Sequence, residues 1–193
     1  MHRLTHTSTF SFPGITRLDG HNLKRLLRKI PANANGLYTF CFQDVRSITN
    51  MAADIISSSH TSSIFELPTL ESVDKKTAKK LAVGTNSLLL GCLNPGADIL
   101  YILSEQKGAL EWSGMKNINK EQAEAISLYK GNVLEFSSLQ SLTADCAEAL
   151  SKYRGEYLCF TGIKKWPTSV RKIMTHYKGA LQTGKKWRES LSD

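Results

Sequence analysis

The chain has 193 residues, a formal net charge of +8 at pH 7 and a hydrophobic content of 41%. This length suits one domain with a continuous core, and no apolar run approaches the roughly 18 residues that a membrane-spanning helix needs. Charges interrupt the apolar positions of the first 30 residues, unlike the core of a secretory signal. We therefore expect a cytoplasmic protein, with delivery into another cell not excluded and acidic partners left open by the positive charge.

One pattern recurs along the chain: apolar, any residue, apolar, two variable residues, apolar, two variable residues, apolar. Its first occurrence is Phe10, Phe12, Ile15 and Leu18. A repeat of about 24 residues indicates stacked units, because one unit alone cannot bury its apolar face. The seven units begin at Phe10, Phe40, Phe65, Leu88, Leu110, Leu134 and Leu158.

Each unit predicts a short strand followed by a helix. The apolar-x-apolar start has the period of a β-strand, so the residue between the two points away from the core. The position after the fourth apolar residue suits a helix N-cap in five units, whereas Pro167 fits the first turn of a helix. Asn119 and Gln122 also have the spacing of a capping box. The five capping residues are Asp19, Thr49, Asp74, Asn119 and Thr143.

Four predicted helices are followed by a basic residue and a glycine. We expect these glycines to adopt the left-handed conformation that terminates helices, with the cation at the negative end of the helix dipole. After the last pair, the segment from Leu181 to Thr183 resembles the start of an eighth strand, and its open edge predicts a weak homodimer through that end. The four pairs are Lys107-Gly108, Lys130-Gly131, Arg154-Gly155 and Lys178-Gly179.

The units resemble those of the leucine-rich-repeat superfamily. Leu134-x-Phe136-x-x-Leu139 and Leu158-x-Phe160-x-x-Ile163 keep the spacing of its signature, although the asparagine that usually ladders the turn is absent. The units look like a divergent bacterial short-repeat type with an alanine-containing helix and a Lys-Gly stop. The resemblance covers about residues 10–183. It implies one α/β solenoid domain over residues 1–193, with polar end segments, a curved parallel sheet on the concave face and helices on the convex face.

The concave face is the usual binding surface of such a solenoid. Its centre is mildly acidic although the chain is basic. We expect a non-enzymatic scaffold that recognises a protein partner through this face; the alternative is that these residues are only solvated strand positions. The candidate partner-binding residues are Glu66, Leu89, Glu111, Glu135, Tyr157 and Cys159.

The basic residues gather mainly toward the carboxyl end. They are either a solvated helix surface or an electrostatic footprint for nucleic acid or another anionic surface. A third function that the sequence leaves open is a secreted or anti-defence effector that captures a target protein. The candidate basic patch consists of Lys164, Lys165, Arg171, Lys172, Lys185, Lys186 and Arg188.

The sequence contains none of the common catalytic or cofactor-binding motifs. GxSxG, Walker-type, HExxH and dinucleotide-binding patterns are missing. The four cysteines lack CxxC or His-rich spacing, so we expect free thiols. Cys159 has no histidine in a neighbouring strand position with which to form a catalytic pair. The sequence therefore predicts no enzyme activity, no cofactor and no metal.

Overall fold

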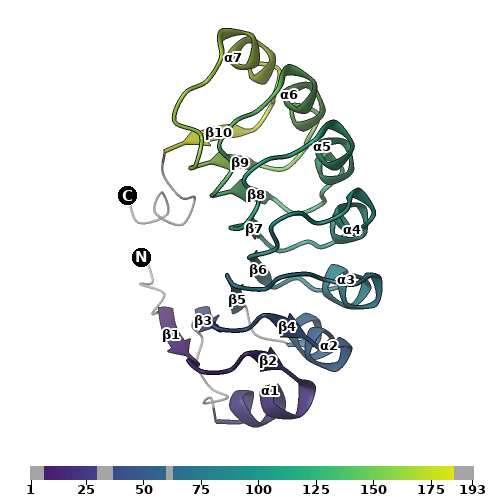
Figure 1. The fold of residues 1–193 in the computed structure, drawn as a ribbon, viewed down its shortest axis with the longest axis vertical. Coiled ribbons are helices and arrows are strands. Elements are labelled where there is room, and N and C mark those ends of the chain that lie inside the picture. The colour runs from purple at the N-terminus through teal and green to yellow at the C-terminus, as the bar shows by residue number, and fades with distance from the viewer. Residues whose placement is uncertain (1–6, 30–36, 60–62, 185–193) are drawn as a thin grey trace, which may run out of the picture.

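A computed structural model describes residues 7–29, 37–59 and 63–184 of the chain. Within these ranges strands and helices alternate, and each unit lies beside the one before it (Figure 1). The large-sheet strands are β1 (Thr7–Ser11), β3 (Leu37–Cys41), β5 (Ser63–Leu67), β6 (Ser87–Leu90), β7 (Leu110–Trp112), β8 (Val133–Phe136), β9 (Tyr157–Phe160) and β10 (Ala180–Thr183). Two further strands, β2 (Arg17–Leu18) and β4 (Ser47–Ile48), form a small second sheet.

The large sheet is parallel and follows the chain order β1-β3-β5-β6-β7-β8-β9-β10. Its register aligns the first apolar residue of every predicted unit, which confirms the predicted phase. The eighth strand predicted at Leu181 is also present, as β10. The aligned residues are Phe10, Phe40, Phe65, Leu88, Leu110, Leu134, Leu158 and Leu181.

Seven helices of the described ranges lie on one side of the large sheet (Figure 1). Each packs against the next helix along the chain. The predicted alternation of strands and helices is thus confirmed as an α/β fold with a parallel sheet. The helices are α1 (Gly20–Leu27), α2 (Asn50–Ser58), α3 (Lys75–Ala82), α4 (Ala97–Leu103), α5 (Lys120–Ser127), α6 (Ala144–Leu150) and α7 (Thr168–Met174).

The five predicted N-cap side chains all accept a hydrogen bond from a helical backbone N–H. At α5 the predicted capping box is complete, with Gln122 N donating to Asn119 Oδ1 over 2.8 Å and Asn119 N donating to Gln122 Oε1 over 2.9 Å. Pro167 differs from its prediction: it occupies the N-cap of α7 rather than the first helical turn. Local sequence signals therefore decide where these helices begin.

The core lies between the large sheet and the helices. Phe40 stacks on Phe65 with ring centroids 5.0 Å apart, and Phe136 stacks on Phe160 at 5.6 Å. Within each pair the two rings occupy equivalent strand positions, because parallel pairing in register places one above the next. The two pairs belong to neighbouring core columns, and Trp112, a fully buried residue, precedes Phe136 and Phe160 in theirs.

The fourth unit departs from the predicted apolar pattern. Leu93, which we expected in the core, is 65% exposed, and Cys92 is buried instead. Nine positions separate Leu88 from Ala97, the first residue of α4, whereas ten separate Phe65 from the first residue of α3. Because the connection from β6 to α4 is one residue shorter, the buried position falls at Cys92, one residue before Leu93.

The predicted left-handed conformation of the helix-stop glycines is wrong. Among the described residues, positive φ angles occur only at Gly14 and Gly184. A Cβ added at Gly131 would instead collide with the carbonyl oxygen of Gly108 and the hydroxyl of Tyr129, and Gly155 and Gly179 are enclosed in the same way. These positions need glycine because the turn of one unit lies directly on the turn of the unit before it.

Three tyrosines bind these stacked turns together. The hydroxyls of Tyr153 and Tyr177 donate to the carbonyl oxygens of Gly131 and Gly155, each over 2.7 Å, and the Tyr129 hydroxyl contacts the Gly108 carbonyl. Burial raises the pKa of all three phenols, so they stay protonated donors. We call this arrangement the Tyr–Gly ladder.

The ladder begins at a buried amide relay one unit earlier. Gln106 Oε1 lies 2.5 Å from the Tyr129 hydroxyl, and Gln106 Nε2 donates to the Asn86 carbonyl over 2.5 Å. The Asn86 side chain accepts from Ser63 N over 3.2 Å and donates to the Ile56 carbonyl over 2.7 Å. Buried polar groups here are therefore paired from one unit to the next, as buried amides require.

Candidate binding faces

The strand face is the side of the large sheet that points away from the helices. The register places its predicted residues in one continuous row across the sheet, so five of the six candidates are brought together as expected. Tyr157 belongs to the adjacent row, paired with Val133 and Ala180. The strand-face row consists of Ser11, Cys41, Glu66, Leu89, Glu111, Glu135, Cys159 and Gln182.

The centre of this row is buried. Glu111 is 2% exposed and Glu135 is 0% exposed, and Leu89 and Cys159 are buried beside them. Glu66 in this row and Tyr157 in the adjacent row are half-buried. The alternative that these residues are only solvated strand positions is therefore wrong at the centre of the sheet. Period two determines which side of a sheet a residue faces, but it carries no information on what encloses that side.

Two carboxylates lie side by side in this row. Glu111 pairs in register with Glu135, on strands about 4.8 Å apart, so the two side chains are direct neighbours. Like charges opposite one another in a sheet repel, and burial strengthens the repulsion. The centre of the strand face therefore brings two acidic side chains together within a basic chain.

The next rung of the row holds a thiol. Burial, together with the charges of Glu135 and Glu111, raises the pKa of Cys159 to about 12. Its Sγ lies 3.5 Å from Gln182 Oε1 on β10. A thiol in these surroundings stays protonated at neutral pH and is a poor nucleophile. All four cysteines are free and buried, as predicted for free thiols.

Hydroxyl side chains line the ends of the strands. Ser113 Oγ donates to the Leu90 carbonyl over 3.3 Å, Ser138 Oγ to the Ser113 carbonyl over 2.5 Å, and Thr161 Oγ1 to the Ser137 carbonyl over 3.3 Å. Each bond joins a unit to the unit before it. The recurrence of Ser or Thr directly after β7, β8 and β9 was the available sequence signal for these contacts, which serve packing.

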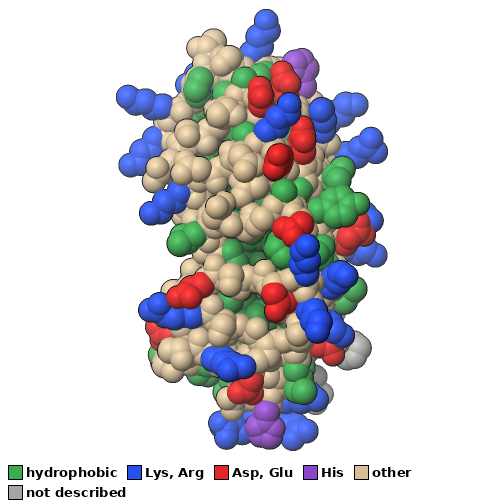
Figure 2. Space-filling model, turned by 45° about the vertical axis from the view of Figure 1, so that its right-hand side comes forward, with side chains coloured by type: hydrophobic (Ala, Val, Ile, Leu, Met, Phe, Trp, Pro, Cys, Tyr) green, Lys and Arg blue, Asp and Glu red, His purple; other side chains and the backbone are tan. Residues whose placement is uncertain are grey.

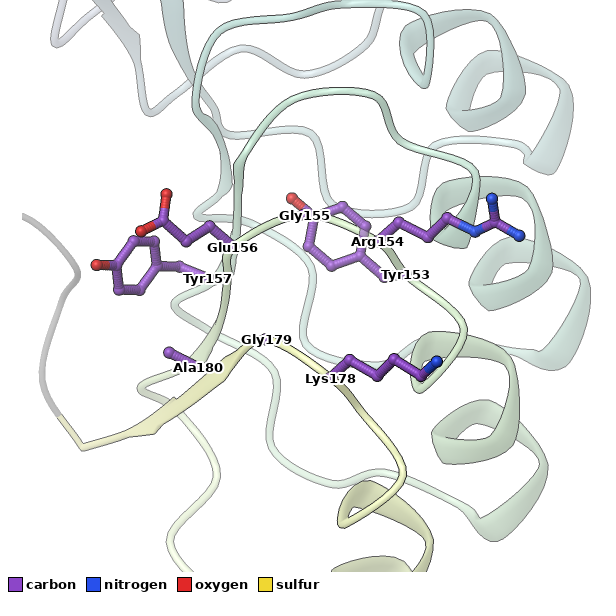
Figure 3. A pocket seen from close by; sticks show the side chains of 8 residues that line it. All are labelled: Tyr153, Arg154, Gly155, Glu156, Tyr157, Lys178, Gly179 and Ala180. Carbon is purple, nitrogen blue, oxygen red and sulfur yellow. The ribbon is translucent and has the colours of Figure 1, made fainter.

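Two hollows open where the helix-to-strand turns reach the sheet. One has a volume of about 530 Å³ and is lined by Lys130, Lys152 and Arg154 among others. The second, of about 350 Å³, lies beside it and shares Arg154. Figure 3 shows Arg154 and Lys178 pointing to one side of the second hollow and Glu156 and Tyr157 to the other. Apart from Tyr157, these residues were not among the candidates from the sequence, although the repeated Lys/Arg-Gly pairs were a signal for them.

The predicted basic patch is only partly within the described residues. Lys164, Lys165, Arg171 and Lys172 are exposed on α7 and the segment before it, whereas Lys185, Lys186 and Arg188 lie outside the described ranges. On the helix side shown in Figure 2, basic and acidic side chains are interspersed. Several of these basic and acidic side chains form ion pairs, such as Lys75 with Asp98 at 3.0 Å.

The described part of the chain contains no group of His, Cys, Asp and Glu side chains suited to a metal ion. None of its helices has both the length and the apolar character required to cross a bilayer. Comparisons with protein-family models and with curated protein sequences found no match for this chain.

Proposed function

We propose that this chain is a leucine-rich-repeat-like solenoid, a single domain with a curved sheet, and that it acts as a non-enzymatic scaffold for a protein partner. The unbroken chain order of the parallel sheet and the helices confined to one side of it support the solenoid. Solenoids of this type bind partners with the strand face, because its side chains are not needed for the core between sheet and helices.

The observation that carries the proposal is the strand-face row itself. The repeating positions of the chain are used by the core, the caps and the Tyr–Gly ladder, whereas the row has no single repeated residue and carries Cys, Glu, Leu or Gln. Variation on a uniform scaffold is the pattern expected where specificity resides. We therefore assign partner recognition to this row and to Tyr157 beside it.

The charges in the row indicate the chemistry of the partner. Glu66, Glu111 and Glu135 make this row acidic within a basic chain. A basic segment of a partner protein has the complementary charge. Since Glu111 and Glu135 are enclosed in the present structure, such a segment reaches them only through a local rearrangement that exposes them.

The test is a binding comparison of three proteins. A lysine- and arginine-rich peptide is titrated into the wild type, the Glu111→Gln/Glu135→Gln variant and the Glu121→Gln/Glu124→Gln variant, which loses the same charge on the exposed surface of α5. We expect the strand-face variant to lose at least about tenfold in affinity and the control less than about twofold, because one desolvated charge pair contributes a few kcal/mol. Equal losses in the two variants contradict the assignment.

A homodimer through the end of the sheet stays a prediction. β10 is the last strand in the sheet order, and Leu181 on it is 37% exposed. An open strand edge can pair with a second copy. Light scattering at increasing concentration tests this, and a constant monomer mass is the contrary result.

A further inference from the structure

The basic residues of the Lys/Arg-Gly pairs form a row of positive charge that the fold itself does not require. Adjacent turns stack through their glycines, so their cations recur at the strand spacing of about 4.8 Å. All of these cations are exposed, and Lys152 joins the row through the larger hollow. We call this row the cation edge; it consists of Lys107, Lys130, Lys152, Arg154 and Lys178.

These cations are not required to complete the helix ends. The last carbonyls of α6 accept backbone N–H groups, from Lys152 to Ala149 over 3.2 Å and from Tyr153 to Leu150 over 3.1 Å. The turn carbonyls of Gly131 and Gly155 accept the tyrosine hydroxyls. The hydrogen-bonding needs of these turns are therefore met without the Lys and Arg side chains.

Little negative charge opposes the cation edge. Within the described ranges its one ion pair is Lys130 with Glu105, at 2.5 Å. The larger hollow has Lys130, Lys152 and Arg154 in its lining and no acidic side chain. In the smaller hollow, Glu156 points away from Arg154 and Lys178 (Figure 3). The two hollows share Arg154 and Gly155 and therefore adjoin one another on neighbouring units.

We propose that the cation edge binds the phosphodiester chain of a single-stranded nucleic acid. A line with one or two positive charges per unit matches a ligand whose negative charges also recur along a chain. An anionic membrane is a flat surface and would also meet the adjoining helix surface. The exposed acidic residues there, such as Glu121, Glu124 and Glu148, would repel it. This surface is separate from the strand-face row and independent of the proposed protein partner.

The hollows favour a nucleic acid over an acidic peptide. Volumes of about 530 and 350 Å³ are in the range of ligand-sized clefts and exceed what a carboxylate side chain occupies. The larger hollow combines its cations with Leu128, which is 57% exposed, and with the polar side chains of Ser127 and Asn132. An apolar surface beside hydrogen-bonding groups suits a nucleobase attached to a charged backbone.

The experiment measures fluorescence anisotropy of a labelled 12-nucleotide single strand over a salt series. Three phosphate contacts predict a slope of log K against log salt of about −2. We expect Lys152→Glu/Arg154→Glu to lower the affinity at least about tenfold and Lys152→Gln/Arg154→Gln to lower it less. The matched control, Lys116→Glu/Lys120→Glu, has the same change of net charge on exposed residues outside the row and should stay within about twofold.

Four results overturn the proposal. The first two are no binding of the oligonucleotide at low salt and an equal loss of affinity in the matched control. The other two are a complete loss of binding in Lys185→Glu/Lys186→Glu with the edge variants unaffected, and stronger binding of a poly-glutamate peptide than of the oligonucleotide. The last result identifies an acidic protein segment as the ligand. Circular dichroism spectra identical to wild type establish that each variant is folded, and Glu111→Gln/Glu135→Gln is expected to bind the oligonucleotide unchanged.

Discussion

The amino-terminal and carboxyl-terminal units build the same layers but join them by different means. Between β1 and β5 the contact from unit to unit is a stack of Phe10, Phe40 and Phe65, with successive ring centroids 5.8 and 5.0 Å apart. From β7 onward a second ring stack, Phe136 on Phe160, occupies the neighbouring core column, and the Tyr–Gly ladder adds a hydrogen bond at every turn. Aromatic stacking is thus common to both regions, and the ladder is confined to one.

The difference follows from the length of the units. Starts at 110, 134 and 158 are evenly spaced, so every turn meets an equivalent turn and a tyrosine finds the same carbonyl each time. Starts at 10, 40 and 65 are farther apart and unequal, and a fixed ladder cannot form across turns of different length. Uniform spacing is what permits a directional interaction to repeat, whereas ring stacking tolerates irregular turns.

The largest expected effect is in the amino-terminal stack. Phe65→Ala removes a fully buried ring between Phe40 and Leu88, and should lower the free energy of unfolding by about 3–5 kcal/mol. Chemical denaturation measures the change. A loss below about 1 kcal/mol would show that the stack is not what joins these units.

A smaller but still large effect is expected at the glycines of the ladder. Gly131→Ala places a methyl group against the Gly108 carbonyl and the Tyr129 hydroxyl, and should cost about 1–3 kcal/mol. At Gly14 a Cβ has open space around it but the φ angle is +79°, so Gly14→Ala should cost about 1 kcal/mol through backbone strain alone. Thermal unfolding of the two variants compares them, and a reversed order contradicts the stacking of the turns.

The ladder hydrogen bond itself is tested by Tyr153→Phe. The change leaves the buried Gly131 carbonyl without its donor and should cost about 1–3 kcal/mol. Tyr101, which is exposed on α4, provides the control Tyr101→Phe with a change near zero. Denaturant midpoints for both variants are the readout. Matching values would assign the stability of this region to ring packing rather than to the hydroxyl.

The smallest expected effect is at a helix cap and depends on pH. The hydrogen bond from Thr77 N, 2.7 Å from Asp74 Oδ1, lowers the pKa of this carboxyl below its usual value. The cap therefore contributes most above the unfolded pKa of about 4 and is lost as pH falls through the lower folded value. Asp74→Ala should cost about 1 kcal/mol at pH 7 and less near pH 2. Chemical denaturation at both pH values measures this cost, and a cost of Asp74→Ala that does not change with pH would show that the carboxylate charge is unimportant for the cap.

Much of this architecture is contained in local sequence signals. Asp19, Thr49 and Asn119 mark helix starts because a cap depends on residues only three positions away. The apolar columns predict the register because each unit must bury the same face against its neighbour. Strand positions, caps and the eighth strand were all predictable on this basis.

Only the tertiary structure decided what those residues do between units. The role of Gly131 as a point of close approach depends on a carbonyl 23 positions earlier, at Gly108, which no local pattern reveals. The enclosure of Glu111 and Glu135, and the alignment of Lys152 and Arg154 along one edge, likewise arise from stacking. Sequence period determines the direction in which a side chain points, and the packing of neighbouring units determines what it meets there.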